Sequence, residues 1–345
     1  MAPARAPRQR PAHRQRGLSL VELMVGLVVG LLLVAGLALM FANASRSSGE
    51  LERSVRHIEN ARHALDLLAE DLSMAGYYGT AAARRFADTA APCADGAAHA
   101  ADINARHATA SPPTLPLAVR GYTPDEAATL ACLSHHKAGT PVLVLRRLET
   151  QSLPAASAPA GVAVLQASHH PQDTLAYTAS ATGTQLALRD RAGLPNTVRR
   201  LVVRLYFVAR CSECSGAGDG IPTLKRVELR GDRHVEVPLA EGIDQVAFDY
   251  GFDTDGDGLQ DLWWGLNGGA SGTESASAAA AGWGNVVAVR VSVLSRNTET
   301  TPGFTDDRRY RVGLRGAANL RISEVSGGMA RRVALARALY GKPML

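Results

Sequence analysis

The chain starts with two hydrophobic patterns that follow each other directly. Residues 18–42 are almost entirely apolar, and about 20 such residues in a helix cross the roughly 30 Å hydrocarbon core of a bilayer. After them, apolar residues recur at spacings of three, four and seven, which is typical of one face of an amphipathic helix. Gly76 predicts a stop, so we expect one helix over about 18–75. The apolar positions of its second part are Leu51, Val55, Ile58, Leu65, Leu68 and Leu72.

Beyond Gly76 the pattern changes to short runs of Val and Leu with partial alternation, which indicates strands. Residues 80–130 are rich in proline and read as loops, and residues 267–283 read as a loop of small residues. One long helix followed by strands predicts an α+β fold, with a mostly antiparallel sheet packed on the helix. The predicted strands are 141–147, 161–166, 184–189, 198–209, 222–230, 234–238, 243–252, 285–296 and 308–314.

The net charge of +5 belongs largely to the first 17 residues, which hold five arginines and no acid. The basic balance therefore gives no support for nucleic-acid binding. Because the arginines precede the apolar run, the positive-inside rule predicts a cytoplasmic N-terminus and a translocated remainder. The run exceeds the 7–15 residues of an ordinary signal peptide. Cleavage at the A-x-A-like site 42–44 is the alternative.

Glu22 lies inside the apolar run, five residues after Gly17. A carboxylate in a membrane segment is energetically unfavourable and usually has a partner and a function. The alternative is a signal anchor in which Glu22 reaches the membrane interface. The position of this acid after a basic leader and a glycine is the most informative feature of the sequence.

The stretch Gly17-Leu-Ser-Leu-Val-Glu22, between that leader and an apolar helix, resembles the N-terminus of type IV prepilins and type II secretion pseudopilins. The resemblance implies that a prepilin peptidase cuts after Gly17 and that Leu18 becomes the methylated N-terminus. It also implies that Glu22 meets the N-terminal amine of a neighbouring subunit. A buried ammonium and carboxylate are each unfavourable alone and tolerable as a pair. Leu18 departs from the family, which more often has Phe or Met at this position. Leu39 stands where many major pilins have a proline.

Four further segments resemble PilW-type minor pilins: LAEDLSMAGYYG, PVLVLRRLE, GIPTLKRVEL and VAFDYGFDTDGDGLQD. The resemblance implies a structural subunit without enzymatic activity that helps to start pilus assembly and lies at or near the tip. It implies a single-pass inner-membrane protein with a periplasmic head, later exposed on the pilus. The implied partners are other minor and major pilins, the prepilin peptidase and the inner-membrane assembly platform. No cofactor is required, and no nucleic acid is expected in the primary role.

This resemblance divides the chain into five parts. Residues 1–17 are the leader, 18–44 the transmembrane and filament-core helix, 45–76 its amphipathic extension, 77–314 the periplasmic head and 315–345 an atypical tail. Two alternatives remain open: a membrane-anchored periplasmic module for adhesion or DNA uptake, and a minor pseudopilin of type II secretion.

The chain has four cysteines, and disulfides persist in the periplasm. Four cysteines allow three pairings. We favour Cys93–Cys132 and Cys211–Cys214, because each closes a local loop. The C-x-x-C at Cys211 could instead be redox-active or half of a zinc site, but zinc needs two more ligands and the sequence has no second C-x-x-C.

The stretch DTDGDGLQD has the spacing of a calcium-binding loop. Gly258 stands where such a loop turns sharply, but Trp264 stands where an EF-hand has its bidentate Glu. The missing ligand has to come from elsewhere, for example from Asp249. A bound ion would stiffen the loop before Trp263 and Trp264, and the alternative is a solvated acidic turn. The candidate ligands are Asp253, Asp255, Asp257, Asp261 and the carbonyl of Leu259.

Enzyme motifs are missing from the sequence, which contains no Walker A motif, no G-x-S-x-G and no H-E-x-x-H. The histidine pairs 135–136 and 169–170 are expected in solvated loops. Residues 323–345 resemble the signature segment of ABC-transporter ATPases, but without Walker motifs they form no nucleotide site here. Chance, a gene-boundary or frameshift artefact and a divergent helical tail remain open for this segment. We expect the pilin-like sequence to end near 314–320.

Overall fold

The computed structural model describes residues 19–81, 85–88, 91–265, 282–299, 309–310, 312–313, 320–321 and 333–341. The chain divides into two compact units, residues 1–52 and 53–345. Helix α1 (Leu20–Met74) is one continuous helix of 55 residues that begins in the first unit and ends in the second.

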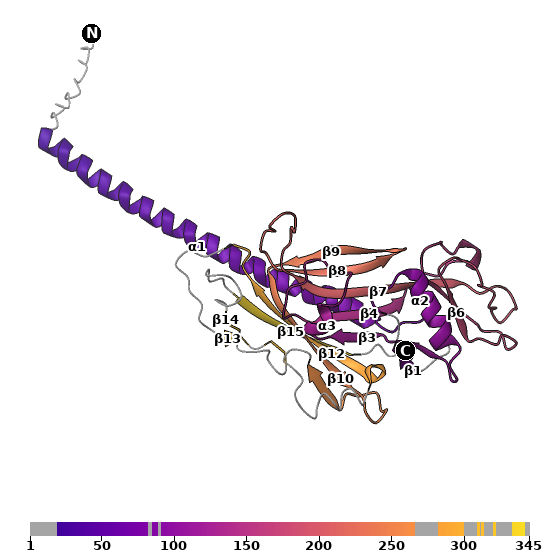
Figure 1. Ribbon diagram of the computed structural model, residues 1–345. Helices are drawn as coiled ribbons and strands as arrows, with labels where there is room; N and C mark the ends of the chain where they lie inside the picture. Colours follow the sequence, from indigo (N-terminus) through magenta and orange to yellow (C-terminus); the bar gives the residue numbers. More distant parts are fainter. Residues whose placement is uncertain are drawn as a thin grey trace, which may run out of the picture. The chain divides into compact units, whose positions relative to one another are not determined.

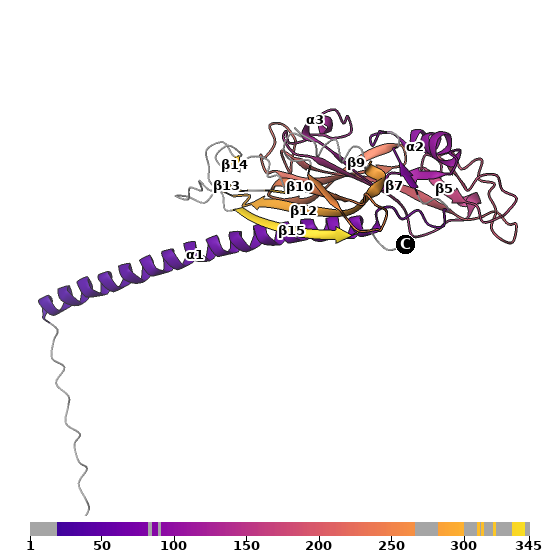
Figure 2. The same ribbon diagram turned by 90° about the horizontal axis from the view of Figure 1, so that it is seen from below.

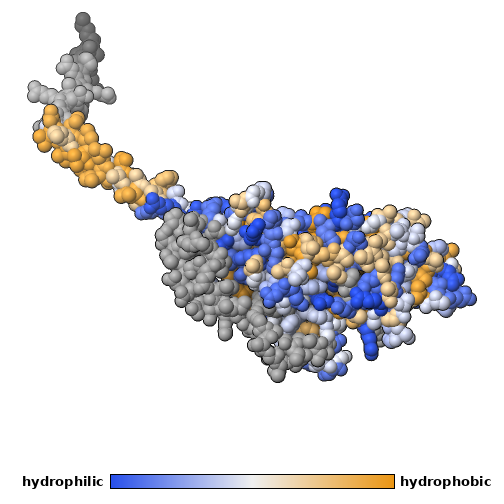
Figure 3. Space-filling model, viewed as in Figure 1, coloured by the Kyte–Doolittle hydropathy of each residue, from blue (hydrophilic) through white to orange (hydrophobic). Residues whose placement is uncertain are grey.

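The first unit contains the N-terminal part of α1. Its large apolar side chains are exposed from Leu20 to Phe41, and they form a continuous hydrophobic surface on this segment (Figure 3). No charged residue occurs between Glu22 and Arg46. This is the one helix in the described part of the chain that is long and apolar enough to cross a membrane. Side chains of this kind on every face of a helix are typical of a membrane span.

In the second unit, the remainder of α1 buries one face. Ala61, Ala64, Leu65, Leu68 and Leu72 are buried at the three- and four-residue spacing of a helix. Each fully buried leucine contributes on the order of 1.5–3 kcal/mol. The predicted apolar stripe is thus correct only in its second half, because Leu51, Val55 and Ile58 are exposed.

The helix ends as the sequence predicts. Gly76 has φ +80°, a conformation that side chains with a Cβ rarely adopt. Its N–H donates to the carbonyl of Arg146 at 3.0 Å, so the turn after the helix is joined directly to the sheet.

A seven-stranded sheet forms one layer of the head, with the order β3-β4-β7-β5-β6 and with β8 and β9 continuing from β7. All of its pairs are antiparallel. The long strand β7 pairs with β5 near its start and with β8 towards its end. The strands are β3 (Val119–Tyr122), β4 (Val142–Leu148), β5 (Val164–Ala167), β6 (Tyr177–Ser180), β7 (Val198–Ala209), β8 (Thr223–Arg230) and β9 (Arg233–Glu241).

A second antiparallel sheet has the order β11-β10-β12-β15. The two sheets and α1 share one core, to which β4 contributes Leu143, β10 contributes Phe248 and β12 contributes Val291. Figures 1 and 2 show both sheets within the head. The strands are β10 (Ile243–Phe252), β11 (Leu262–Gly265), β12 (Val286–Arg296) and β15 (Val333–Gly341).

A second core lies on the opposite face of the seven-stranded sheet, where Val142 and Val144 alternate with the residues that face the helix. The head also contains short elements. They are β1 (Arg85–Ala87), which pairs in parallel with β2 (Thr114–Pro116), the helices α2 (Gly96–Asp102) and α3 (Pro124–Ala127), the π-helical turn η1 (Ile103–Ala108), and the 3-10 turns η2 (Ala155–Ser157) and η3 (Trp283–Asn285). The strands β13 (Arg309–Tyr310) and β14 (Leu320–Arg321) pair with each other.

The prediction that residues 80–130 are loops is wrong for the helices α2 and α3. The side chain of Asp95 accepts the Ala98 N–H at 2.8 Å and caps α2. Thr123 and Glu126 form a capping box at the start of α3. Both capping residues can be recognised in the sequence, but the many prolines and alanines around them favour the prediction of a loop.

Two other expectations need correction. Residues 184–189 form no strand and make an isolated bridge between Arg189 and Pro195. Residues 333–341 form β15 rather than the helix considered for the tail, and their nine residues pair with β12. An unpaired edge of β12 would leave backbone N–H and C=O groups without partners, and this pairing satisfies them.

Candidate functional site

The predicted processing site lies at the start of the helix. Gly17 and Leu18 lie outside the described residues. Ser19 directly precedes α1, and its Oγ accepts the N–H of Glu22 at 3.2 Å. Oε2 of Glu22 accepts the N–H of Ser19 at 3.4 Å. The two residues therefore form a capping box, the arrangement in which Ser and Glu three residues apart satisfy each other's backbone donors.

The capping box gives Glu22 a local role that sequence reasoning missed, although the S-x-x-E signal is present. An acid in the first turn is also favoured by the positive end of the helix dipole. Glu22 is exposed, and a carboxylate has about four acceptor positions. The contact with Ser19 therefore leaves room for a cation at the same carboxylate.

A second acid, Asp71, fixes the other end of α1 to the head. It is only 6% exposed and contacts Arg204 and the hydroxyl of Tyr206. Arg226 lies 3.5 Å and Arg147 3.8 Å from its carboxylate. Arginines from β4, β7 and β8 thus converge on one helix side chain.

Glu228 completes this network from β8. It contacts Arg226, lies 3.4 Å from Arg204 and 2.8 Å from Arg230. Burial alone would raise the pKa of Glu228, but the surrounding arginines outweigh it and lower the pKa. The network holds the helix in one position on the sheet, because a shift by one turn would leave buried charges without partners.

The acidic loop brings together three of its predicted ligands. Asp253, Asp255 and Asp261 each place a carboxylate oxygen within 4.8 Å of the others. Gly258 has φ +88°, as expected for a sharp turn. Asp257 is outside this group. Asp249 is buried on β10, opposite Gly265 and Arg290, and it too lies outside this group.

The carboxylates of this loop are largely engaged by the loop itself. Asp253 accepts the N–H groups of Gly256 at 2.6 Å and Gly258 at 2.9 Å. Asp261 accepts the N–H of Thr254 at 2.8 Å, and these hydrogen bonds lower the pKa of Asp261. The donor set fits a hard cation, but the turn is complete without one. Calcium binding therefore stays a prediction.

The two tryptophans after the loop have different surroundings. Trp264 packs against the main core and lies 5.8 Å from Trp283, ring centre to ring centre. Arg290 stacks on Trp263, with its guanidinium carbon 4.3 Å from the ring centre. Both tryptophans are partly exposed, but Trp264 packs against the core, whereas Trp263 lies on the other side of the strand.

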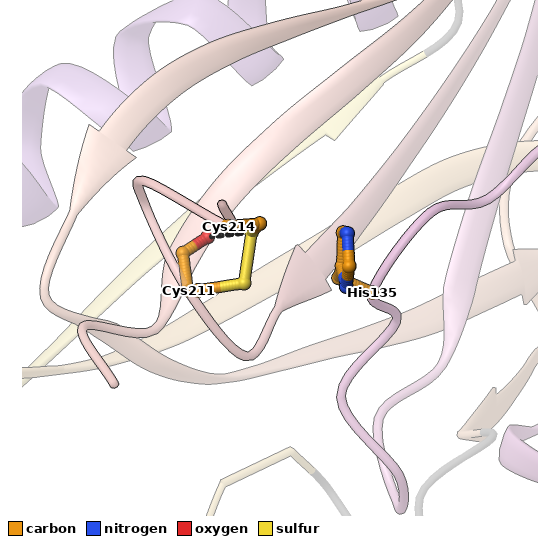
Figure 4. A group of neighbouring side chains, drawn as sticks. All are labelled: His135, Cys211 and Cys214. Carbon is orange, nitrogen blue, oxygen red and sulfur yellow. Dashed lines mark hydrogen bonds between the residues drawn. A yellow bond between two sulfur atoms is a disulfide. The ribbon is translucent and has the colours of Figure 1, made fainter. Parts of the chain in front are cut away.

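Both favoured disulfides are present, Cys93–Cys132 and Cys211–Cys214. Sequence reasoning missed a neighbour of the second one. His135, expected in a solvated loop, is exposed, but a ring nitrogen lies within 4.8 Å of both sulfur atoms (Figure 4). His136 points elsewhere and contacts the Thr140 carbonyl at 2.9 Å.

Two family models match the chain. Residues 12–38 match the prokaryotic N-terminal methylation motif, which includes Gly17, Leu18 and Glu22. Residues 205–337 match the type IV pilus-assembly protein W, from within β7 into β15. Together the two matches support a PilW-type minor pilin of the type IV pilus. The PilW match extends past residue 320, so the pilin-like sequence continues beyond the end that we expected.

The PilW pilins are a family of structural proteins, and the match implies interaction with other pilus components in a membrane-associated assembly. The methylation motif and the exposed apolar helix indicate that it is anchored in a membrane. The strands β8 to β12, which form much of the main core, all lie within the PilW match.

A short stretch has a different similarity. Over 34 residues, 10% of the chain, it is 71% identical to the intermembrane phospholipid transport system ATP-binding protein MlaF of Escherichia coli strain K12. The identity is the same for the proteins of this name from E. coli O6:H1 and O157:H7. The match covers 13% of the length of these relatives. No solved structure matches the chain.

Proposed function

We propose that this PilW-type pilin helps to start assembly of the type IV pilus and lies at or near its tip. The observation that carries the proposal is the position of Glu22. It is an exposed acid in the first turn of α1, and the 23 residues after it carry no charge. It is the fifth residue after Gly17, where cleavage is predicted.

The proposed mechanism begins with cleavage after Gly17 by the prepilin peptidase. The new amine on Leu18 then lies one residue from Ser19, whose N–H already contacts Glu22. In the hydrocarbon, an uncompensated ammonium or carboxylate is strongly unfavourable. Pairing the amine of one subunit with Glu22 of the next removes both penalties, and it does so in one register only.

The proposed topology follows from the charge distribution. The arginines of the leader keep the N-terminus in the cytoplasm, and the head crosses into the periplasm. Two disulfides suit an oxidising compartment. In this proposal the chain has a structural role, catalyses no reaction and needs no cofactor. Its partners are other minor and major pilins and the inner-membrane assembly platform.

Two substitutions separate the assembly role of Glu22 from its capping role. Glu22→Gln removes the charge but keeps a side chain that completes a capping box. Ser19→Ala removes the cap, at about 0.5–2 kcal/mol of helix stability, but keeps the charge. We expect Glu22→Gln to abolish most pili in cells that lack the native copy, and Ser19→Ala to leave most of them.

The measurement is the number of pili per cell by electron microscopy, with mass spectrometry of the mature N-terminus. Methylated Leu18 in the wild-type chain is the expected result. An N-terminus at Ser45, or normal piliation with Glu22→Gln, would contradict the proposal. Normal piliation without the gene, together with lost adhesion, would instead favour the periplasmic binding module.

A further inference from the structure

The C-x-x-C disulfide lies where two distant segments are locked together. Cys211 directly follows β7, and His135 belongs to the loop that precedes β4. The N–H of Arg210 donates to the carbonyl of His135 at 2.9 Å, and the N–H of Lys137 donates to that of Val208 at 2.8 Å. These backbone contacts hold the imidazole beside the two sulfur atoms, as Figure 4 shows.

The loop that carries the two cysteines keeps its shape through contacts other than the disulfide. Oδ1 of Asp219 accepts the N–H groups of Ser212 at 3.0 Å and Ile221 at 2.9 Å, and Oδ2 accepts that of Glu213 at 2.9 Å. Reduction of the disulfide therefore leaves both side chains near their present places.

The charges around the sulfur atoms favour thiolates. Nζ of Lys225 lies 3.4 Å from Sγ of Cys214. The same Nζ forms an ion pair with Oε1 of Glu236 at 2.7 Å. A cation next to a cysteine stabilises the thiolate, which is the form that binds metals and exchanges disulfides. Cys211 is 3% exposed whereas Cys214 is partly exposed, so a reductant reaches Cys214 first.

The third group is an imidazole with an available lone pair. Arg210 donates to Nδ1 of His135 at 3.1 Å, so this nitrogen acts as an acceptor. A metal cation would take the place of this donor. A cavity of about 300 Å³ opens beside the disulfide and is lined by Arg210, both cysteines and the glycine-rich turn 216–220. It has room for a water molecule as a fourth ligand.

We propose that reduction of the Cys211–Cys214 disulfide creates a site for one zinc ion, held by the two thiolates and His135. Two sulfurs, one nitrogen and an open position match the ligand types and the tetrahedral coordination of Zn²⁺. The oxidised chain has no thiolates and releases the metal. The site is thus a redox-dependent metal site, separate from the acidic loop, whose oxygen donors suit a hard cation.

The reduction consumes one dithiol. A thiolate of the dithiol attacks Sγ of Cys214, and Cys211 leaves as a thiolate. The second thiol of the reductant then attacks the mixed disulfide, and Cys214 leaves as a thiolate beside Lys225. Two electrons pass to the protein, and the reductant becomes a cyclic disulfide. Zinc binding releases any protons still held by the two cysteines.

The test uses the full mature chain in detergent micelles. One sample stays oxidised, and the other is reduced with dithiothreitol, which is then removed under anaerobic conditions. Both samples are titrated with Zn²⁺ in competition with a chromophoric chelator. We expect one zinc per reduced chain and none per oxidised chain. Co²⁺ as a probe should give the absorption bands of a tetrahedral site with thiolate ligands.

Variants assign the ligands. Cys214→Ser should abolish binding, and His135→Gln, a change at an exposed side chain, should weaken it about tenfold or more. Three controls should bind as the wild type does: Cys93→Ser/Cys132→Ser, the exposed-histidine change His169→Gln, and Asp255→Asn in the acidic loop. Absence of zinc binding by the reduced chain, or binding that survives both Cys214→Ser and His135→Gln, would overturn the proposal.

Discussion

Two of the acids of helix α1 lie in very different surroundings, Glu22 in its first turn and Asp71 in its last. Asp71 is buried and meets Arg204, Arg226, Arg147 and the Tyr206 hydroxyl within the same chain. Glu22 is exposed and shares hydrogen bonds with Ser19. The fold supplies three arginines to Asp71. The carboxylate of Glu22, in contrast, keeps acceptor positions for a cation from another subunit.

The largest expected effect comes from removing the acid with internal partners. Asp71→Ala removes the buried carboxylate that Arg147, Arg204 and Arg226 share, and breaking a buried ion pair by removing one partner typically costs about 3–5 kcal/mol. We expect that loss in the unfolding free energy of the head, measured by denaturant titration with near-ultraviolet circular dichroism. Glu22→Ala, measured in the same way, should leave the head unchanged. Equal effects of the two changes would break the comparison.

A matched pair of leucines tests the same contrast without charge. Leu68 is 0% exposed and Leu32 is 68% exposed. Leu68→Ala should destabilise the head by about 2–5 kcal/mol, because it removes buried methyl groups and leaves a cavity. Leu32→Ala removes no buried contact and should leave the head at wild-type stability. A loss below about 1 kcal/mol with Leu68→Ala would show that α1 does not form part of the head core.

The head should also be sensitive to acid through His99. Burial, followed by the charge of Arg146, lowers the pKa of His99 to about 4. The unfolded chain takes up this proton near pH 6.5 and the folded head only near pH 4, so stability falls as the pH drops between these values. The loss is on the order of 3 kcal/mol.

Thermal unfolding between pH 7 and pH 4 measures this slope, and His99→Gln is the control that removes the titrating group. The variant should show a flatter profile over that range. The carboxyl of Glu228, whose pKa is also lowered, acts in the same sense, but it loses its stabilising effect only at lower pH, below the ordinary pKa of a glutamate. An unchanged profile in His99→Gln would assign the acid sensitivity to another group.

The smallest expected effect concerns the acidic loop, whose carboxylates are partnered by its own backbone. If calcium binds, a tenfold excess over its dissociation constant stabilises the head by about 1.4 kcal/mol. Differential scanning calorimetry with Ca²⁺ and with a chelator measures the shift. Asp253→Asn/Asp255→Asn should remove it, and a shift that persists in this variant would place the ion elsewhere.

Sequence reasoning was most accurate where the pattern is local. The bounds of β7 and β10 agree with prediction, and α1 differs by two residues or fewer at each end. These elements carry strong periodicity and end at glycine or turn residues. The helices α2 and α3 were missed, because each is short and its cap is a weaker signal than the surrounding prolines.

The sites show the same limit. The disulfide pairing could be predicted because each pair is close in sequence. The approach of His135 to Cys211 could not, because about 75 residues separate them, and backbone contacts between the loop before β4 and the end of β7 bring them together. Asp71 was likewise unremarkable in the sequence, since its three arginines come from three different strands.

The most direct test of the central claim, that the charge of Glu22 is neutralised by another subunit, is the amount of other pilins that co-purify with this chain. The chain is isolated from solubilised membranes as wild type, Glu22→Gln and Ser19→Ala, and its partners are quantified by mass spectrometry. The account predicts that Glu22→Gln loses most of the co-purifying pilins, while Ser19→Ala retains them. If the Glu22→Gln chain, with its leader removed, co-purified with as much of the other pilins as the wild type does, this result would contradict the account.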